Sequence, residues 1–380
     1  METRKLYYED AFLREFDGQV VRCQPGKTGW DVVLDATAFY PEGGGQPADH
    51  GTLGQANVLD VHERGGEIVH TCDAPLAAGE TVHGAVDWAR RFDHMQQHSG
   101  EHSVSGMLCA AYKCSNVGFH LGEESVIIDY DTEIPWEGML EIERRANAYI
   151  WEDRPAEISF PTPQELAALP YRSKKALEGA VRIVSFPGAD TCACCGTHVA
   201  RSGQVGLVKF LSCQRLRGGV RLELLCGGRA MRYLAGCWEQ SVAAGQALSV
   251  KPLALGGAVE RTLGELAAAR ERCAELESAL FARVAEAFRG AGDVLLLWEP
   301  LSSDGVRRLC DAVSAVCGGR CAVFAGEENA YKYAVMAPGR DIREWVKALN
   351  AALRGRGGGR DGFAQGSVQA AEAEIRAFFA

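Results

Sequence analysis

Hydrophobic and polar residues alternate in short runs through the first 88 residues, and turn residues separate the runs. One run is GQVVRC, which starts at Gly18, and paired glycines at Gly65 and Gly66 mark a hairpin further on. Alternation with a period of two puts apolar side chains on one face of a strand. Residues 1–88 therefore predict a small β-barrel or sandwich of about five or six strands.

The pattern changes at Trp88, where apolar residues begin to recur at three- and four-residue steps. Phe92, Met95 and Val104 belong to this stripe, which predicts a helix up to about residue 113. An extended pair, a second helix and further strands follow, and they end near Cys226. The segment 89–227 therefore predicts an α+β domain.

Apolar residues keep a helical spacing beside many charges in 228–290, as Leu263 and Leu266 illustrate. This pattern predicts a helical hairpin or a short coiled coil, which is either a spacer or a dimer contact. Strand and helix patterns alternate in 291–380 and predict a separate α/β domain, interrupted by the glycine-rich residues 355–366. The predicted fold class is therefore multidomain α+β.

Composition and charge narrow the class of protein. The chain has 380 residues, of which 47% are hydrophobic and 24% charged, and this excludes a mostly disordered chain. The net charge is −10, but residues 1–88 hold 15 acidic against 6 basic residues, so the remainder is compatible with nucleic acid. No apolar run approaches the roughly 20 residues that span a bilayer, and no secretory pattern is present. We expect a cytoplasmic protein without a membrane segment, whose 14 cysteines are thiols.

The segment HMQQHSGEH places His94, His98 and His102 four residues apart on one helix face. Imidazoles one turn apart can bind one metal ion, and any two of the three fit this geometry. The alternative is a polar helix face that has these histidines by coincidence. The motif is not HExxH, so a glutamate base between two zinc ligands is not predicted.

The segment TCACCGTHV gathers Cys192, Cys194, Cys195 and His198 within a few residues. Thiolate and neutral imidazole are preferred zinc ligands, and a tight turn brings a cysteine close to His198. On its own the segment is also compatible with a redox pair. Together with the histidine helix it predicts one tetrahedral Zn²⁺ site.

The segment FYPEGGGQP contains Gly43, Gly44 and Gly45, followed by Gln46. Glycines let backbone N–H groups approach a ligand closely, which indicates a binding loop. The simpler alternative is a permissive turn between strands. The segment lacks the GK[ST] of a Walker A motif, and no ATP site is predicted elsewhere.

These three segments, in this order, resemble the editing half of alanyl-tRNA synthetase and the long AlaX-type alanyl-tRNA editing hydrolases. HSGEH and CCGTH are similar to the family's HTATH and CGGTH. The resemblance implies four metal ligands: His98, His102, Cys194 and His198. His94 and Cys192 fall outside that set, and Cys195 stands where the family has a glycine.

The resemblance also implies the identity of each segment. The expected domains are a β-barrel with the glycine-rich motif at 1–88, a zinc-binding editing domain at 89–227, a helical spacer at 228–290, and a DHH-associated-like domain for tRNA binding or dimerisation at 291–380. The ATP-dependent half of the synthetase has no room before His98. We therefore expect an enzyme that removes amino acids from tRNA and cannot attach them.

The implied activity is hydrolysis of mischarged Ser-tRNA(Ala), and also of Gly-tRNA(Ala), with Zn²⁺ as the cofactor. Gln46 matches the family residue linked to substrate discrimination, and Gly43, Gly44 and Gly45 are the other implied substrate-binding residues. A pocket that hydrogen-bonds the seryl hydroxyl can reject alanine by roughly 10⁴-fold. No catalytic residue is assigned, because zinc with four protein ligands either organises the pocket or must lose a ligand to activate water.

The segment RGRGGGR places Arg354, Arg356 and Arg360 among glycines, where guanidinium groups can reach tRNA phosphates. The alternative is a surface loop in a dimerisation domain, and a homodimer through this domain or the spacer is compatible with both. The competing functional class is a noncatalytic zinc-containing tRNA-binding protein. A metal-dependent phosphoesterase is disfavoured, because the chain lacks a DHH triplet and its ligands are not carboxylates.

Overall fold

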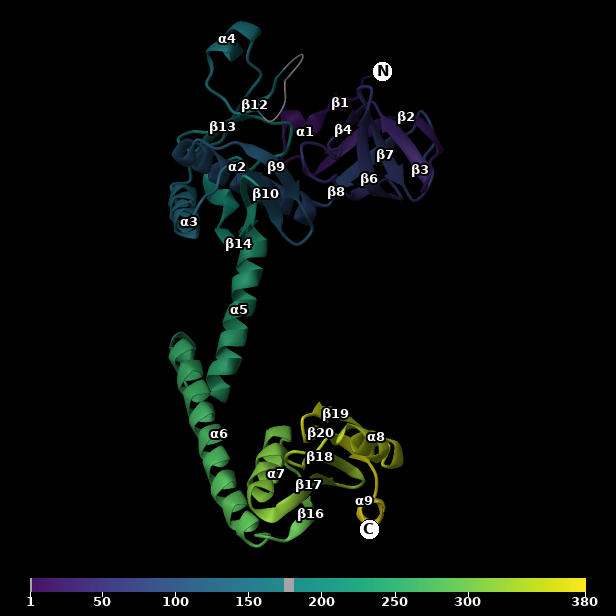
Figure 1. The fold of residues 1–380 in the computed structure, drawn as a ribbon. Helices are drawn as coiled ribbons and strands as arrows, with labels where there is room; N and C mark the ends of the chain where they lie inside the picture. The colour runs from purple at the N-terminus through teal and green to yellow at the C-terminus, as the bar shows by residue number, and fades with distance from the viewer. Residues whose placement is uncertain (1, 174–180) are drawn as a thin grey trace. The chain divides into compact units, whose positions relative to one another are not determined.

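The computed structural model describes residues 2–173 and 181–380 (Figure 1). The chain divides into two compact units, Met1–Ser241 and Val242–Ala380, and the boundary falls inside the helix α5 (Gly227–Ala247). Within the described residues no single helix is long and apolar enough to cross a membrane. By length and composition alone, α5 and Pro252–Glu286 pass that test only as a pair, across a 74° bend.

Six strands near the N-terminus enclose the first hydrophobic core. They pair in the order β2-β3-β7-β6-β5-β8, and β8 pairs back onto β2, so the ring of pairings closes. Alternate residues such as Val20, Val32 and Ile68 face inward and are buried, as the period of two requires. The strands are β2 (Glu15–Pro25), β3 (Trp30–Leu34), β5 (Gly51–Leu53), β6 (Ala56–Arg64), β7 (Glu67–Cys72) and β8 (Thr81–Val86). Three short elements complete this region: β1 (Arg4–Lys5) and α1 (Leu6–Glu9) precede β2, and β4 (Ala36–Thr37) lies between β3 and β5 in the sequence.

The helix α2 (Trp88–Tyr112) is the central element of the remainder of the first unit. It begins where the Asp87 carboxylate accepts the backbone N–H of Arg90 (3.1 Å), and it ends at Lys113, which has a left-handed backbone conformation. Most of its residues from 94 to 108 are buried, polar ones included. A helix buried on several faces can present functional side chains to an enclosed site.

Among the described residues, two sheets and three helical elements make up the rest of this part of the first unit. The first sheet has the order β14-β15-β10-β9 and the second the order β11-β12-β13. The strands are β9 (Asn116–Leu121), β10 (Val126–Tyr130), β11 (Glu157–Ser159), β12 (Ile183–Phe186), β13 (Asp190–Ala193), β14 (Val208–Leu216) and β15 (Gly219–Cys226). The helices are α3 (Trp136–Trp151), α4 (Pro163–Ala168) and the 3-10 turn η1 (Ser202–Val205). Of these elements, α3, η1, β9, β13 and β15 contact α2.

A buried ion pair fastens α2 to the loop that contains the three glycines. Arg91 and Asp49 are fully buried and form this pair, and the Asp49 carboxylate also accepts the backbone N–H of Tyr40 (2.6 Å). The Arg91 guanidinium donates further to the carbonyls of Ala38 and Ala11. Because a buried charge is tolerated only when it is paired and hydrogen-bonded, this network fixes the position of the loop relative to α2.

The second unit contains a five-stranded sheet in the order β16-β17-β18-β20-β19. Its strands are β16 (Gly292–Trp298), β17 (Gly318–Glu327), β18 (Ala330–Met336), β19 (Arg356–Arg360) and β20 (Phe363–Gln369). Its helices are the 3-10 turn η2 (Pro252–Ala254), α6 (Leu255–Glu286), α7 (Ser303–Cys317), α8 (Arg343–Ala352) and α9 (Glu372–Phe379). Phe281 and Ala285 at the end of α6 are buried in the same core as Val306 of α7, so this end of the helix belongs to the α/β domain.

The multidomain α+β organisation predicted from the sequence is confirmed. The predicted interruption at residues 355–366 is wrong, because the glycines of β19 pair with β20. A Cβ atom on Gly357 would lie 2.5 Å from the carbonyl oxygen of Gln365, and one on Gly359 would lie 1.9 Å from that of Phe363. The glycines therefore permit a close approach of two strands rather than a break.

Candidate functional site

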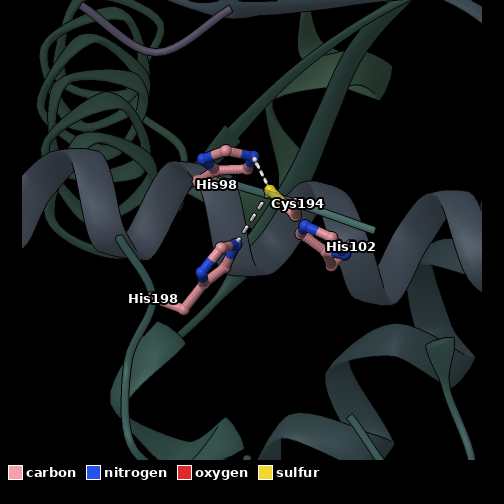
Figure 2. Close-up of side chains that lie close together, drawn as sticks. All are labelled: His98, His102, Cys194 and His198. Atoms are coloured by element: carbon pink, nitrogen blue, oxygen red, sulfur yellow. Dashed lines mark hydrogen bonds between the residues drawn. The ribbon is translucent and has the colours of Figure 1, made fainter. Parts of the chain in front are cut away.

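Three histidines and one cysteine converge in the first unit (Figure 2). His98 and His102 come from consecutive turns of α2, while Cys194 and His198 follow β13. Their ligand atoms all lie within 4.8 Å of one another. The Cys194 Sγ atom lies 3.4 Å from His98 Nε2 and 3.6 Å from His198 Nε2. The structure therefore brings together all four residues predicted as metal ligands, and this group could hold a metal ion.

The electrostatics of the cluster favour a thiolate surrounded by imidazoles. Burial raises the pKa of the Cys194 thiol, but the nearby His98 and His198 and the hydrogen bonds from His102 and His198 outweigh burial and hold that pKa well below its usual range. Burial lowers the pKa of His198 to about 3, so this imidazole is neutral at pH 7. Thiolate and neutral imidazole are the forms that bind transition metals.

Hydrogen bonds fix the orientation of two of the imidazole rings. His98 Nδ1 contacts the Gln46 amide oxygen at 2.9 Å, and His102 Nδ1 contacts the Asp190 carboxylate at 2.8 Å. Asp190 is held in turn by the Arg172 guanidinium through two contacts of 2.7 Å. With Nδ1 engaged on both rings, Nε2 is the atom that each offers to a metal ion.

His102 differs from His198 in its charge. Burial lowers the pKa of His102, but the hydrogen bonds to Asp190 and Cys194 raise it to about 10. The cluster therefore attracts positive charge at the His102 Nε2 position. A bound cation would take the place of that proton, so metal binding is expected to release it.

Gln46 is fully buried and links the glycine-rich loop to the cysteine-rich turn. Its amide oxygen accepts the backbone N–H of Thr197 (3.1 Å) besides contacting His98, and its amide nitrogen donates to the Thr197 hydroxyl (2.9 Å). Both ends of this side chain are thus engaged with protein groups. The substrate contact predicted for Gln46 stays a prediction, and a seryl hydroxyl would have to compete with these bonds.

A cavity of about 490 Å³ lies beside the four convergent residues. This size is in the range of small-molecule sites. Among the described residues, its lining includes three of the four candidate ligands, two of the predicted glycines, and also Glu101, Phe119 and Cys195. The three ligands are His98, His102 and Cys194, and the two glycines are Gly44 and Gly45. Phe119 stacks on His98 with ring centroids 5.0 Å apart. A Cβ atom on Gly45 would lie 2.6 Å from the Phe119 ring, which explains the need for glycine there.

Sequence reasoning missed several residues that shape this site. Glu101 lines the cavity, and its carboxylate accepts hydrogen bonds from Ser105 (2.7 Å) and Asn116 (2.6 Å). Its position one turn after His98 was a usable signal, because i and i+3 share a helix face. Asp190 had no such signal, since 88 residues separate it from its partner His102.

The other cysteines and histidines of the two motifs have different surroundings. His94 is buried, and its Nδ1 atom has no hydrogen-bond partner among the described residues. Cys192 lies near His102 and Asp190 and forms an overlapping group with them, whereas Cys195 is exposed. Neither His94 nor Cys192 belongs to the four-residue cluster. Their place outside the ligand set stays a prediction.

The three arginines predicted to contact tRNA lie in the second unit and differ in their partners. Arg354 forms an ion pair with Glu374 (2.8 Å) and donates to the Gln369 carbonyl (2.7 Å). Arg356 and Arg360 are exposed on β19. Arg356 lines a surface hollow that also includes Lys332. These two arginines, rather than Arg354, therefore present guanidinium groups that are accessible to an anion.

Comparison with known families matches three parts of the chain. Residues 3–90 match the family described as tRNA synthetases class II (A). Residues 181–222 match the family described as threonyl and alanyl tRNA synthetase second additional domain, and these include Cys194 and His198. Residues 295–379 match the DHHA1 domain family.

The individual relatives are named either as alanyl-tRNA editing proteins or as alanine–tRNA ligases. The alanyl-tRNA editing protein AlaX-L of Pyrococcus horikoshii is 28% identical over 98% of this chain and 96% of its own length. The alanyl-tRNA editing protein Aarsd1 of Danio rerio is 33% identical over 59% of this chain, and the match spans 58% of that relative. The alanine–tRNA ligase of Pyrococcus abyssi is 31% identical over 97% of this chain, which spans 42% of the ligase.

The chain thus aligns over nearly its whole length with an editing protein and with less than half of a ligase, and the descriptions of two of its three matched families name tRNA synthetases. The names of these relatives concern alanyl-tRNA editing and the ligation of alanine to tRNA. Over nearly its whole length the chain is similar to a long AlaX-type alanyl-tRNA editing protein, which agrees with the resemblance of its three sequence motifs.

Proposed function

We propose that this chain is a trans-editing aminoacyl-tRNA deacylase, which hydrolyses Ser-tRNA(Ala), and also Gly-tRNA(Ala), to free tRNA and amino acid. The observation that supports this proposal best is the convergence of His98, His102, Cys194 and His198 beside a cavity of about 490 Å³, which the first three of them line. The cavity wall also contains Gly44 and Gly45 of the glycine-rich loop. A substrate ester in this cavity would contact both motifs at once.

Zn²⁺ is the metal that best fits the four side chains. One thiolate and three imidazoles form a soft to borderline donor set, which suits zinc and disfavours Mg²⁺ and Ca²⁺. When bound, zinc would supply positive charge beside the ester carbonyl. Four protein ligands fill a tetrahedral site, which supports a role for zinc in organising the pocket.

Other residues of the cavity would position the substrate ester. Gly44 and Gly45 have φ values of 61° and 86°, a conformation that favours glycine and lets backbone N–H groups approach an ester oxygen. Phe119, whose ring stacks on His98, contributes an apolar surface to the cavity wall. Hydrolysis then transfers the acyl group to water and releases the ribose hydroxyl of the tRNA.

Release of labelled amino acid from charged tRNA(Ala) tests the proposal. The protein is expected to deacylate Ser-tRNA(Ala) faster than Ala-tRNA(Ala), by roughly 10⁴-fold, because polar groups that bind a hydroxyl are left unpaired by a methyl group. Equal rates on the two esters would contradict the predicted selectivity. Binding of tRNA without any release would favour the alternative, a noncatalytic zinc-containing tRNA-binding protein.

The second unit is proposed to hold the body of the tRNA. The 3′ end that bears the ester is nearly common to all tRNAs, so selection of tRNA(Ala) needs a contact elsewhere. Arg356 and Arg360 are exposed on β19, and Lys332 shares a hollow with Arg356. A homodimer stays a prediction as well, and it is supported by exposed leucines on α6, such as Leu263 and Leu280.

Replacing Arg356 and Arg360 together by alanine is expected to weaken tRNA binding and to reduce its salt dependence. The slope of log K against log salt should fall by about one unit for each phosphate that the variant no longer neutralises. Binding measured over a salt series checks this. The matched control is Arg376→Ala, which removes an exposed arginine already paired with Glu372 (2.6 Å). An unchanged slope in the double variant would assign β19 to assembly instead.

A further inference from the structure

Two cysteines outside the four-residue cluster lie with their sulfur atoms in contact at the end of α2. The Cys114 thiol donates a hydrogen bond to the Cys109 Sγ atom, and the two sulfur atoms are 3.9 Å apart. Cys109 lies in the last turn of the helix, and Cys114 follows the helix cap at Lys113. Lys113 has a φ of 54°, and this left-handed turn brings the chain back toward the last helical turn.

The surroundings divide the chemical roles of the two thiols. The hydrogen bond from Cys114, together with the positive charge of Arg172 and the backbone N–H of Asn116, outweighs burial and lowers the pKa of Cys109 to about 7. The same contact with Cys109, assisted by burial, raises the pKa of Cys114. At neutral pH, Cys109 is therefore substantially a thiolate, whereas Cys114 keeps its proton. A thiolate beside a protonated partner thiol is the arrangement of a reactive and a resolving cysteine.

The reactive sulfur is also accessible. Cys109 is half-buried and lines an open hollow of about 520 Å³, together with Arg172 and Asp190. A small oxidant can reach it there, whereas Cys114 is buried behind it. Thiols with a low pKa and solvent access are the ones that hydroperoxides oxidise.

A second pair of neighbouring cysteines differs from this pair because neither thiol has access to solvent. Cys310 and Cys321 of the second unit are both fully buried, and the Cys310 thiol donates to the Cys321 carbonyl (3.5 Å). The neighbouring thiol and burial raise the pKa of Cys310, so it stays protonated. This pair is close in space but has no access to solvent, and it serves as an internal control.

We propose that Cys109 and Cys114 are a redox modification site, which forms a reversible disulfide when a hydroperoxide oxidises Cys109. The Cys109 thiolate attacks one peroxide oxygen, the O–O bond breaks, and Cys109 becomes a sulfenic acid as hydroxide leaves. The Cys114 sulfur then attacks the Cys109 sulfur, the S–O bond breaks, and water leaves with the Cys114 proton. The peroxide is reduced, two thiols are oxidised, and a cellular dithiol or glutathione restores them by exchange.

The geometry requires only a local movement. The two sulfur atoms must approach from 3.9 Å to the roughly 2.05 Å of a disulfide. The bond would tie the end of α2 to the start of β9 at Asn116. The Asn116 side chain donates a hydrogen bond to Glu101, which lines the cavity beside the four-residue cluster. This hydrogen bond therefore links the segment that contains Cys114 to the cavity wall. The chemistry itself does not depend on the proposed deacylase activity.

Peptide mapping of the full-length protein tests this inference. Reduced protein is treated with hydrogen peroxide, blocked with N-ethylmaleimide, and digested with trypsin. Cleavage after Lys113 places Cys109 and Cys114 on different peptides, which end at Lys113 and at Arg144. We expect these two peptides to be recovered as one species that dithiothreitol separates, while the Cys310 and Cys321 peptides stay unlinked.

Two further results would decide the matter. In Cys114→Ser the sulfenic acid on Cys109 cannot be resolved, so it should be trapped by dimedone, and the Cys109 peptide should stay unlinked. Recovery of both peptides of the parent protein as maleimide adducts, under conditions that oxidise the exposed Cys195, would overturn the proposal. Recovery of Cys109 only as a sulfinic or sulfonic acid would overturn it equally, because Cys114 would then not act as the resolving thiol.

Discussion

Replacing His98 and Cys194 together by alanine is expected to abolish metal binding. The two residues come from different elements, α2 and the turn after β13, so their loss removes half of the ligand set from both sides of the site. Purified parent protein should contain about one Zn²⁺ per chain, as four Cys and His ligands predict, and the double variant close to none. Metal analysis of both proteins measures this directly.

The same substitution should also change the response to chelation. A metal that pins α2 to the cysteine-rich turn contributes its binding free energy to folding, and this is about 10 kcal/mol or more for structural zinc. A chelator should therefore lower the thermal unfolding temperature of the parent protein and leave that of the double variant unchanged. Deacylation of Ser-tRNA(Ala) should fall with the metal content.

Cys192→Ala is the matched control for this experiment. Cys192 lies two residues before Cys194 and near His102 and Asp190, but it lies outside the four-residue cluster. The control variant should keep its zinc. Loss of zinc from Cys192→Ala, with zinc retained in the double variant, would move the ligand set to His102, Asp190 and Cys192 and contradict our assignment.

The sequence indicated which residue types gather at the site, because the motifs are local. Imidazoles four residues apart must share a helix face, and Cys194 and His198 lie in one tight turn. That these two motifs meet is a consequence of tertiary packing. It was inferred from the chemistry of zinc and from a family resemblance, and periodicity alone did not predict it.

The contacts that orient the site were not predictable from local pattern. Gln46 meets Thr197 across 151 residues, and Asp190 meets His102 across 88. Such pairs depend on how whole elements pack, for which a single sequence offers no periodic signal. The glycines of β19 led to the wrong prediction of an interruption, because glycine is typical both of a turn and of a close approach between two strands.

Gln46→Ala is expected to slow deacylation of both Ser-tRNA(Ala) and Ala-tRNA(Ala). In the structure the Gln46 amide oxygen contacts His98 Nδ1 and accepts the Thr197 N–H, so alanine would leave both groups without this partner. Groups that orient a metal ligand typically contribute 10- to 100-fold to metal affinity or activity, and a loss of about that size is expected here. Zinc affinity should weaken in parallel, which a competition titration with a chelator measures.

The family resemblance leads to a different expectation for the same variant. If Gln46 reads the seryl hydroxyl, its removal should speed attack on the alanyl ester and narrow the selectivity while zinc affinity stays unchanged. Gln46→Glu separates the two roles, because a carboxylate can still accept from His98 Nδ1 and the Thr197 N–H but cannot donate to the Thr197 hydroxyl. Recovery of zinc affinity and of both rates in Gln46→Glu would support positioning. A variant Gln46→Ala with full zinc affinity and a faster alanyl reaction would instead place Gln46 at the substrate, and its buried bonds to Thr197 would then have to open when serine binds.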